Sequence, residues 1–126
     1  MTVFQAGQRW AYAAPPQLED SRILIGAIVE FEGGRTIVCC AVLAALDRDE
    51  NGTLRRTTIP FLPMTSDALS RSVTSPDGTA ALPEAFASNF AAWSADERGA
   101  TYFTVPFEGS LDRMIAMQMA AIVEQA

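Results

Sequence analysis

The stretch "RILIGAIVEFEGGRTIVCCAVLAAL", residues 22–46, decides the fold class of this chain. It contains two apolar runs, 22–32 and 35–46, on either side of the pair Gly33 and Gly34. Both runs are rich in the β-branched residues that favour strands, and a glycine pair accepts the positive φ angles of a tight hairpin turn. The stretch therefore predicts two neighbouring antiparallel strands.

The two strands differ in how many of their faces are apolar. Alternation gives 22–32 one apolar face and one half-polar face. The apolar face is expected to hold Ile23, Ile25, Ala27, Val29 and Phe31. In 35–46 both alternating faces are apolar, which is typical of a central strand covered on both sides. We therefore expect 22–32 and 35–46 in the middle of the sheet.

Three weaker strands are predicted outside this hairpin. They are 8–14 ("QRWAYAA"), 53–61 ("TLRRTTIPF") and 101–107 ("TYFTVPF"). Pro60 and Pro63 are expected to end the second of them, because proline cannot donate to a sheet ladder and is confined to strand ends and edges. Pro106 places the last strand at an edge for the same reason.

The helices are expected in the second half of the chain. They are 65–73, with Thr65 or Ser66 as N-cap, 83–98, with Pro83 at its first position, and 111–125, with Ser110 as N-cap. The "SPDG" sequence at 75–78 predicts a turn. Two apolar helical stripes are expected to face the core: Phe86, Phe90 and Trp93; and Leu111, Ile115, Met119 and Ile122.

Together these elements predict a single α+β domain, residues 1–126. A bent antiparallel sheet of four to five strands comes from the N-terminal half. Two main helices, 83–98 and 111–125, and one short helix come from the C-terminal half, and the main helices are expected to cover one face of the sheet. The predicted core is Ile23, Ile25, Val29, Phe31, Val38, Val42, Phe86, Phe90, Trp93, Phe103, Leu111, Ile115 and Ile122.

Charge and hydropathy argue against several classes of partner. The net charge of −6 disfavours nucleic acids and anionic lipid surfaces. The chain has no stretch of about 18 apolar residues and no basic start followed by an apolar run, so we expect neither a membrane span nor a signal peptide. A cytoplasmic protein is expected.

The residue types available for catalysis are few. The chain has no His and no Lys, which removes the usual general base and Schiff-base chemistry. Cys39 and Cys40 are neighbours in an apolar strand, where buried inert thiols are expected. Glu30 and Glu32 share a strand face beside the glycine turn, where solvated carboxylates are expected. We therefore expect a non-catalytic protein, and a cysteine- or carboxylate-dependent hydrolase is the least favoured alternative.

The 47–58 loop begins like a calcium-binding loop. Its opening residues Asp47, Asp49, Asn51 and Gly52 fit the pattern D-x-[DN]-x-[DN]-G. Position nine is Arg55, and position twelve is Thr58 instead of the bidentate acid that such a loop requires. We therefore expect a plain Asn-Gly turn between two strands and no metal or cofactor, with calcium binding as an alternative.

Two further features are candidate binding surfaces. Trp10 and Tyr12, with Gly26 nearby, could form an aromatic platform for a small molecule, although strand aromatics are usually core.

The other surface is the last helix, whose "MIAMQMAAIV" run is apolar over most of its circumference. Such a helix is either deeply buried or packed against a second chain. The residues expected at this interface are Met114, Met117 and Met119.

The favoured function is therefore a small, bacterial-type cytoplasmic interaction module. It would act through contact with a protein partner or through a homodimer, as an adaptor, an inhibitor or an immunity-type protein. An acidic surface would suit a basic partner. The alternative is a small-molecule or calcium-binding module that uses the sheet aromatics or the 47–58 loop.

Overall fold

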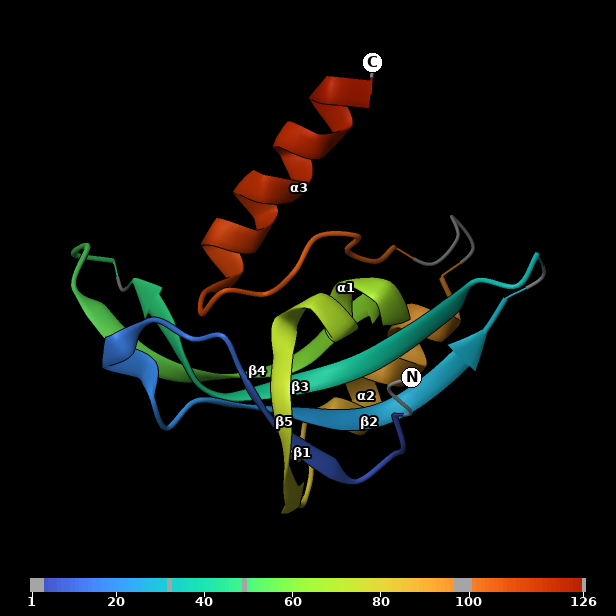
Figure 1. Cartoon of the computed structure of the whole chain (residues 1–126), viewed down its shortest axis with the longest axis horizontal. Helices are drawn as coiled ribbons and strands as arrows, with labels where there is room; N and C mark the ends of the chain where they lie inside the picture. The colour runs from blue at the N-terminus through green and yellow to red at the C-terminus, as the bar shows by residue number, and fades with distance from the viewer. Residues whose placement is uncertain (1–3, 32, 49, 97–100, 126) are drawn as a thin grey trace.

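One antiparallel sheet of five strands organises the structure, a computed structural model that describes residues 4–31, 33–48, 50–96 and 101–125 (Figure 1). The strand order is β4-β3-β2-β1-β5. The strands are β1 (Gln8–Tyr12), β2 (Arg22–Glu30), β3 (Thr36–Arg48), β4 (Leu54–Thr65) and β5 (Val73–Thr79). The helices are the 3-10 turn η1 (Pro16–Leu18), α1 (Ser66–Ser72), α2 (Phe86–Ser94) and α3 (Leu111–Gln125). The predicted α+β class is confirmed, with most strands in the N-terminal half.

The predicted hairpin forms the middle of the sheet. β2 pairs with β3, and each has a further strand on its outer side. All six residues from Ile37 to Val42 are buried, so β3 is covered on both faces as its apolar alternation predicted. Gly33 and Gly34 both adopt positive φ angles in the connection.

A bulge in β2 changes which side chains share a face. The register between β2 and β3 shifts between Ile25 and Ala27, at Gly26. Ile23 and Ile25 therefore pack on one face, whereas Ala27 and Val29 pack on the opposite face. The prediction that all of these residues share one face was wrong, because strict alternation does not survive an inserted residue.

Prolines lie within the two edge strands instead of ending them. β4 continues through Pro60 and Pro63, and the predicted 75–78 turn is part of β5, where Pro76 lies opposite Trp10. Both predictions were wrong for the same reason. An edge strand has one row of backbone groups that needs no partner, so a missing N–H there costs no ladder bond.

The predicted 101–107 strand was also wrong. Residues 101–110 form an extended segment that makes only single bridges within the described part of the chain, Phe103 with Met64 and Ser110 with Leu46. Backbone hydrogen bonds from Phe103 N to Pro63 O and from Thr65 N to Phe103 O hold this segment beside β4.

The helices lie close to their predicted positions. Thr65 caps α1 by accepting a hydrogen bond from Ala68 N. α2 starts three residues later than Pro83 and ends at Ser94, and residues 97 and 98 of the predicted helix lie outside the described residues. α3 has the predicted bounds. None of the helices in the described part of the chain has the length and apolar character needed to cross a membrane.

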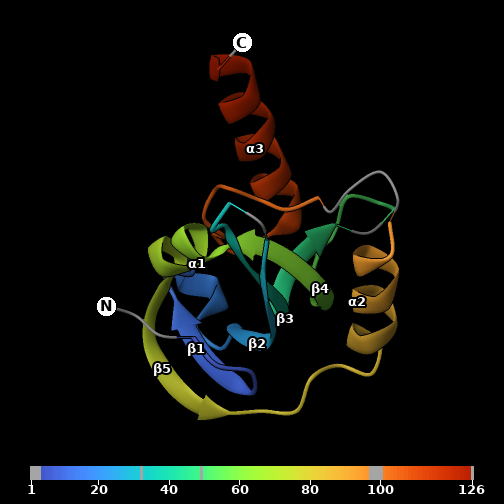
Figure 2. The ribbon, with the colours of Figure 1, turned by 90° about the vertical axis from the view of Figure 1, so that its right-hand side faces the viewer.

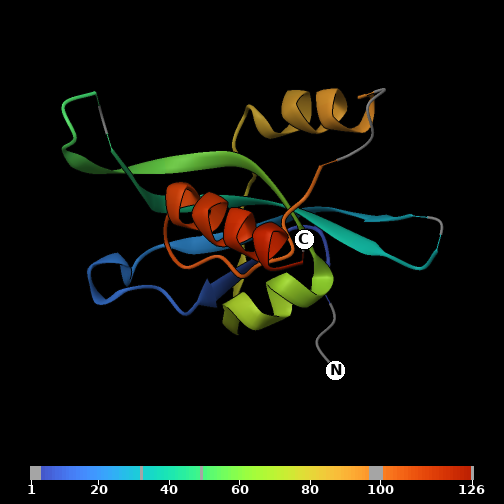
Figure 3. The same ribbon diagram turned by 90° about the horizontal axis from the view of Figure 1, so that it is seen from above.

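The two main helices lie on opposite faces of the sheet, so the prediction of a common face was wrong (Figures 2 and 3). α2 packs through Phe86, Phe90 and Trp93 on the face that carries Ile37, Cys39, Ala41 and Leu43 of β3. Met114 and Leu111 of α3 pack on the other face, together with α1. Buried residues of this second, larger cluster are Trp10, Tyr12, Ile23, Ile25, Val38, Cys40, Val42, Ala45, Ile59, Leu62, Met64, Ala68, Leu69, Phe107 and Met114.

Most of the predicted core is confirmed. Buried members are Ile23, Ile25, Val38, Val42 and Phe86; Val29, Phe90, Trp93, Phe103 and Leu111 are partly buried and packed against the core. Phe31, Ile115 and Ile122 were assigned to the core wrongly, because all three are exposed.

Candidate functional site

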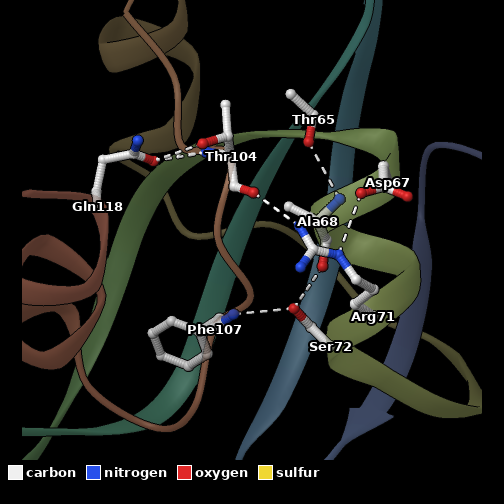
Figure 4. A network of polar contacts seen from close by, with 8 residues as sticks. All are labelled: Thr65, Asp67, Ala68, Arg71, Ser72, Thr104, Phe107 and Gln118. Carbon is white, nitrogen blue, oxygen red and sulfur yellow. Dashed lines mark hydrogen bonds and ion pairs between the residues drawn. The ribbon is translucent and has the colours of Figure 1, made fainter. Parts of the chain in front are cut away.

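The 101–110 segment connects α1 to α3 through a polar network (Figure 4). Arg71 donates from Nη2 to the carbonyl of Thr104 at 2.8 Å, and Phe107 N donates to Ser72 Oγ at 2.9 Å. On the other side, Thr104 N donates to Gln118 Oε1 at 2.7 Å. These bonds fix the first two turns of α3 relative to the body of the protein.

The first turn of α3 is determined by a sharp bend and a cap. Gly109 has φ of +114°, and a Cβ at this position would lie 2.9 Å from Pro15 Cδ. Only glycine fits such a bend without strain. Ser110 Oγ accepts from Arg113 N at 3.1 Å, the predicted N-cap, and Arg113 also pairs with Glu108 at 2.9 Å.

The side of α3 that faces the sheet is short. Leu111, Met114 and Gln118 follow helical spacing i, i+3, i+7 and so lie on one side. Met114 is completely buried, Leu111 packs against the same cluster, and Gln118 binds Thr104. Beyond these residues α3 leaves the body and extends outward to the C-terminus (Figures 1 and 2).

A second side of α3 is apolar and exposed. Its large side chains are Ile115 (45% exposed), Met119 (60%), Ile122 (57%) and Val123 (71%). We call these four residues the outward face of α3. Of the residues predicted at an interface, Met119 lies on this face, Met117 is half-buried, and Met114 is core instead. The sequence pattern did find the helix, but it assigned Ile115 and Ile122 to the core and left Val123 out.

An aromatic groove with a volume of about 400 Å³ lies between α2, β4, the 101–110 segment and α3. Its lining residues are Phe61, Pro63, Asn89, Trp93, Thr101, Tyr102, Phe103 and Gln118. Gln118 places the groove next to the outward face, because Ile115 and Ile122 are its i−3 and i+4 neighbours on the helix surface. No local sequence signal indicated this groove, because four separate segments contribute to it.

Polar contacts hold the groove walls in place. Trp93 Nε1 donates to the carbonyl of Thr101 at 2.6 Å, which ties α2 to the 101–110 segment. Arg35 donates to the Tyr102 hydroxyl, and its guanidinium lies 5.4 Å from the centre of the Tyr102 ring. The groove is therefore a preformed apolar surface with amide groups at its rim.

The proposed aromatic platform is part of the core. Trp10 and Tyr12 are 8% and 6% exposed, and their rings pack against Phe4 and Phe107 respectively. The space expected beside Gly26 is filled, since a Cβ there would lie 2.2 Å from the Phe86 ring. A ligand could use these aromatics only if the core opened.

Both thiols are buried. Cys39 and Cys40 are completely inaccessible and point to opposite faces of β3. Burial raises the pKa of the Cys39 thiol to about 12 and also raises the pKa of Cys40. A thiol with so high a pKa carries almost no thiolate at neutral pH, which is the reactive form.

The acidic candidates are dispersed over the surface. Glu30 is exposed, whereas Glu32 and Asp49 lie outside the described residues. Asp47, at the start of the calcium-like loop, lies 3.9 Å from Arg55 on the adjacent strand. Among the described residues, no three His, Cys, Asp or Glu side chains gather in a way that could hold a metal ion.

The outward face of α3 and the aromatic groove are thus two surfaces that the described part of the chain builds without filling. Comparisons with models of protein families, with curated proteins and with solved structures gave no match for this chain.

Proposed function

We propose that this protein is a small non-catalytic interaction module that binds a protein through the outward face of α3. The observation that supports this most strongly is the contrast within one helix. Met114 is completely buried, whereas Ile115, in the next position, is 45% exposed. The helix is therefore fixed at its base and presents an apolar surface beyond it.

The size of the exposed face supports a docking role. Four large apolar side chains on one helix expose on the order of 400 Å², in the range at which exposed patches on small proteins are often functional. Met119 adds a flexible, polarizable side chain of the kind that adapts to a partner surface. Leaving such a face in water is unfavourable, and covering it stabilises a complex.

The available chemistry supports a role without catalysis. The chain has no His and no Lys. Its two thiols are buried with raised pKa values, so neither is an activated nucleophile. Unpaired thiols also fit a reducing compartment, and we propose the cytoplasm. The net charge of −6 argues against a nucleic-acid partner.

Affinity purification from the native host tests this proposal. The baits are the tagged wild-type chain, an Ile115→Glu/Ile122→Glu double variant, and an Arg113→Gln/Ala120→Glu control that makes the same change in net charge at exposed positions on the other side of the helix. We expect the wild-type and control baits to capture one protein in stoichiometric amount, and the double variant not to capture it. The untagged chain itself counts as such a protein. The same proteins with all three baits, or none with any, would contradict the proposal.

The aromatic groove favours a second candidate function, the binding of a small apolar molecule. Its volume of about 400 Å³ falls within the usual range for ligand sites. The probe 8-anilinonaphthalene-1-sulfonate tests it by fluorescence. Asn89→Trp, which places a large ring on the groove wall, is expected to abolish probe binding, whereas Asn89→Ala retains it. Equal binding by both variants would rule the groove out as the site.

A further inference from the structure

We infer that the occupant of the outward face of α3 is a second copy of this chain, bound through an antiparallel pairing of the two α3 helices. This inference rests on the proposed function and names the partner.

The spacing of the apolar residues is self-complementary. At about 100° per residue, Ile115, Met119 and Ile122 occupy one stripe of the helix. If a two-fold axis passes between Gln118 and Met119, Ile115 of one chain lies opposite Ile122 of the other, and the same contact occurs twice. Such a repeated contact is what a symmetric homodimer interface requires.

The charge distribution permits this contact despite the net charge of −6. Residues 114–123 form a ten-residue run without a charged side chain. No like charges therefore meet where the helices touch, and carboxylates elsewhere on the two surfaces are screened by salt beyond about 10 Å. The same run offers no acidic group to a basic foreign partner, which favours a second copy over such a partner at this face.

The antiparallel direction follows from where the bodies lie. α3 is fixed to the body at Met114 and extends outward to its C-terminus (Figure 2). A parallel pair would place the two acidic bodies side by side, whereas an antiparallel pair places them at opposite ends of a two-helix layer. Opposed helix dipoles also attract each other when the helices run antiparallel.

The area available is sufficient for a specific dimer of moderate affinity. Two outward faces bury on the order of 800 Å² of apolar surface between them. Contacts at the rim of the two faces bring the total close to about 1,200 Å², the lower end of stable interfaces. A substitution to Glu occurs twice in the symmetric interface, so Ile122→Glu is expected to weaken the dimer by at least about 100-fold.

Disulfide cross-linking of the full chain tests both the pairing and its direction. Both native thiols are buried, so an introduced cysteine is the thiol that reacts in the folded state. Met119→Cys, close to the two-fold axis, is expected to form a covalent dimer on mild oxidation, and Ala120→Cys, on the far side of the helix, is the control. An Ile115→Cys chain is expected to form a disulfide with an Ile122→Cys chain, and neither variant should form a disulfide-linked dimer with a second copy of the same variant.

Each outcome decides the inference. Links of Ile115→Cys to itself and of Ile122→Cys to itself, without the mixed product, would show a parallel pair and overturn it. Self-pairing would be overturned altogether by two results together. Light scattering would give the mass of one chain for wild type at high micromolar concentration, and Met119→Cys would form no more covalent dimer than the Ala120→Cys control. If a foreign protein is nevertheless captured in a manner that depends on Ile115 and Ile122, the proposed function survives. If nothing is captured, the proposed function fails as well.

Discussion

Truncation of Met114 tests whether the base of α3 is packed as the structure describes. Met114 is 0% exposed within the cluster that includes Val42 and Phe107. Met114→Ala removes buried apolar atoms and leaves a cavity, which costs about 2–5 kcal/mol in well-packed cores. Helix propensity does not offset this loss, because Met and Ala are both strong helix formers.

Met119→Ala is the matched control for this variant. The substitution is chemically identical and lies in the same helix, but Met119 is 60% exposed, so the expected cost in a dilute sample is within about 0.5 kcal/mol. Both values are measured by urea unfolding followed by circular dichroism at low protein concentration, with the slope against urea checked for constancy. Equal costs for the two variants, or a cost below about 1 kcal/mol for Met114→Ala, would refute the packing at the base of α3.

Three further predictions concern the body of the protein. Gly26→Ala would place a Cβ 2.2 Å from the Phe86 ring, so urea unfolding is expected to show a loss of stability of about 1–3 kcal/mol. In a Phe86→Leu background the same substitution should cost less, and additive costs of the two substitutions would contradict the clash. Because burial raises the pKa of Cys39 and Cys40, the folded state holds their protons more tightly than the unfolded state. The free energy of unfolding is therefore expected to fall as pH rises above about 9, by up to about 1.4 kcal/mol per pH unit for each thiol. Unfolding of a Cys39→Ala/Cys40→Ala variant should show a shallower fall, and an unchanged pH dependence would contradict this. Asp77 accepts a hydrogen bond from Arg22 Nε at 2.7 Å, and this bond is the chief reason that the pKa of Asp77 is lowered. The ion pair therefore stabilises the fold above about pH 4 and ceases to do so on acidification. Asp77→Asn should lower the melting temperature at pH 7 but not at pH 2, and equal shifts at both would refute the ion pair.

The centre of the fold could be predicted from the sequence because its signals are local. Two apolar runs around Gly33 and Gly34 specify a hairpin by composition and turn geometry alone. The apolar character of both alternating faces in 35–46 then places this strand inside the sheet. The aromatic stripe of Phe86, Phe90 and Trp93 likewise predicts which side of α2 packs, and all three rings contact Phe61.

The errors arise where tertiary context overrides a local rule. The bulge in β2 lies at Gly26, where the Phe86 ring occupies the space that a side chain would fill, and a contact sixty residues away leaves no trace in the strand pattern. Pro76 predicts a turn locally, but it is tolerated in β5 because that strand forms the edge of the sheet. Edge position is a property of the whole topology and cannot be derived from four residues.

The candidate site was only partly predictable for a related reason. Periodicity shows that α3 is apolar on several sides, but it cannot show which side the body covers. The deciding contacts are those of Met114 with the core and of Gln118 with Thr104. They leave Ile115 and Ile122 exposed, although both had been assigned to the core.

Hydrogen exchange along α3 tests the central claim, that the outward face is an interface between two copies of the chain. Without tertiary packing beyond Gln118, a helix of this length is marginal in water, so amides 119–125 of the dilute chain should exchange rapidly while that of Met114 stays protected. We predict that protection of 119–125 rises as concentration increases from the low to the high micromolar range, and that Ile122→Glu abolishes this rise. Slow exchange of 119–125 in the dilute chain, unchanged by concentration and by Ile122→Glu, would contradict the account.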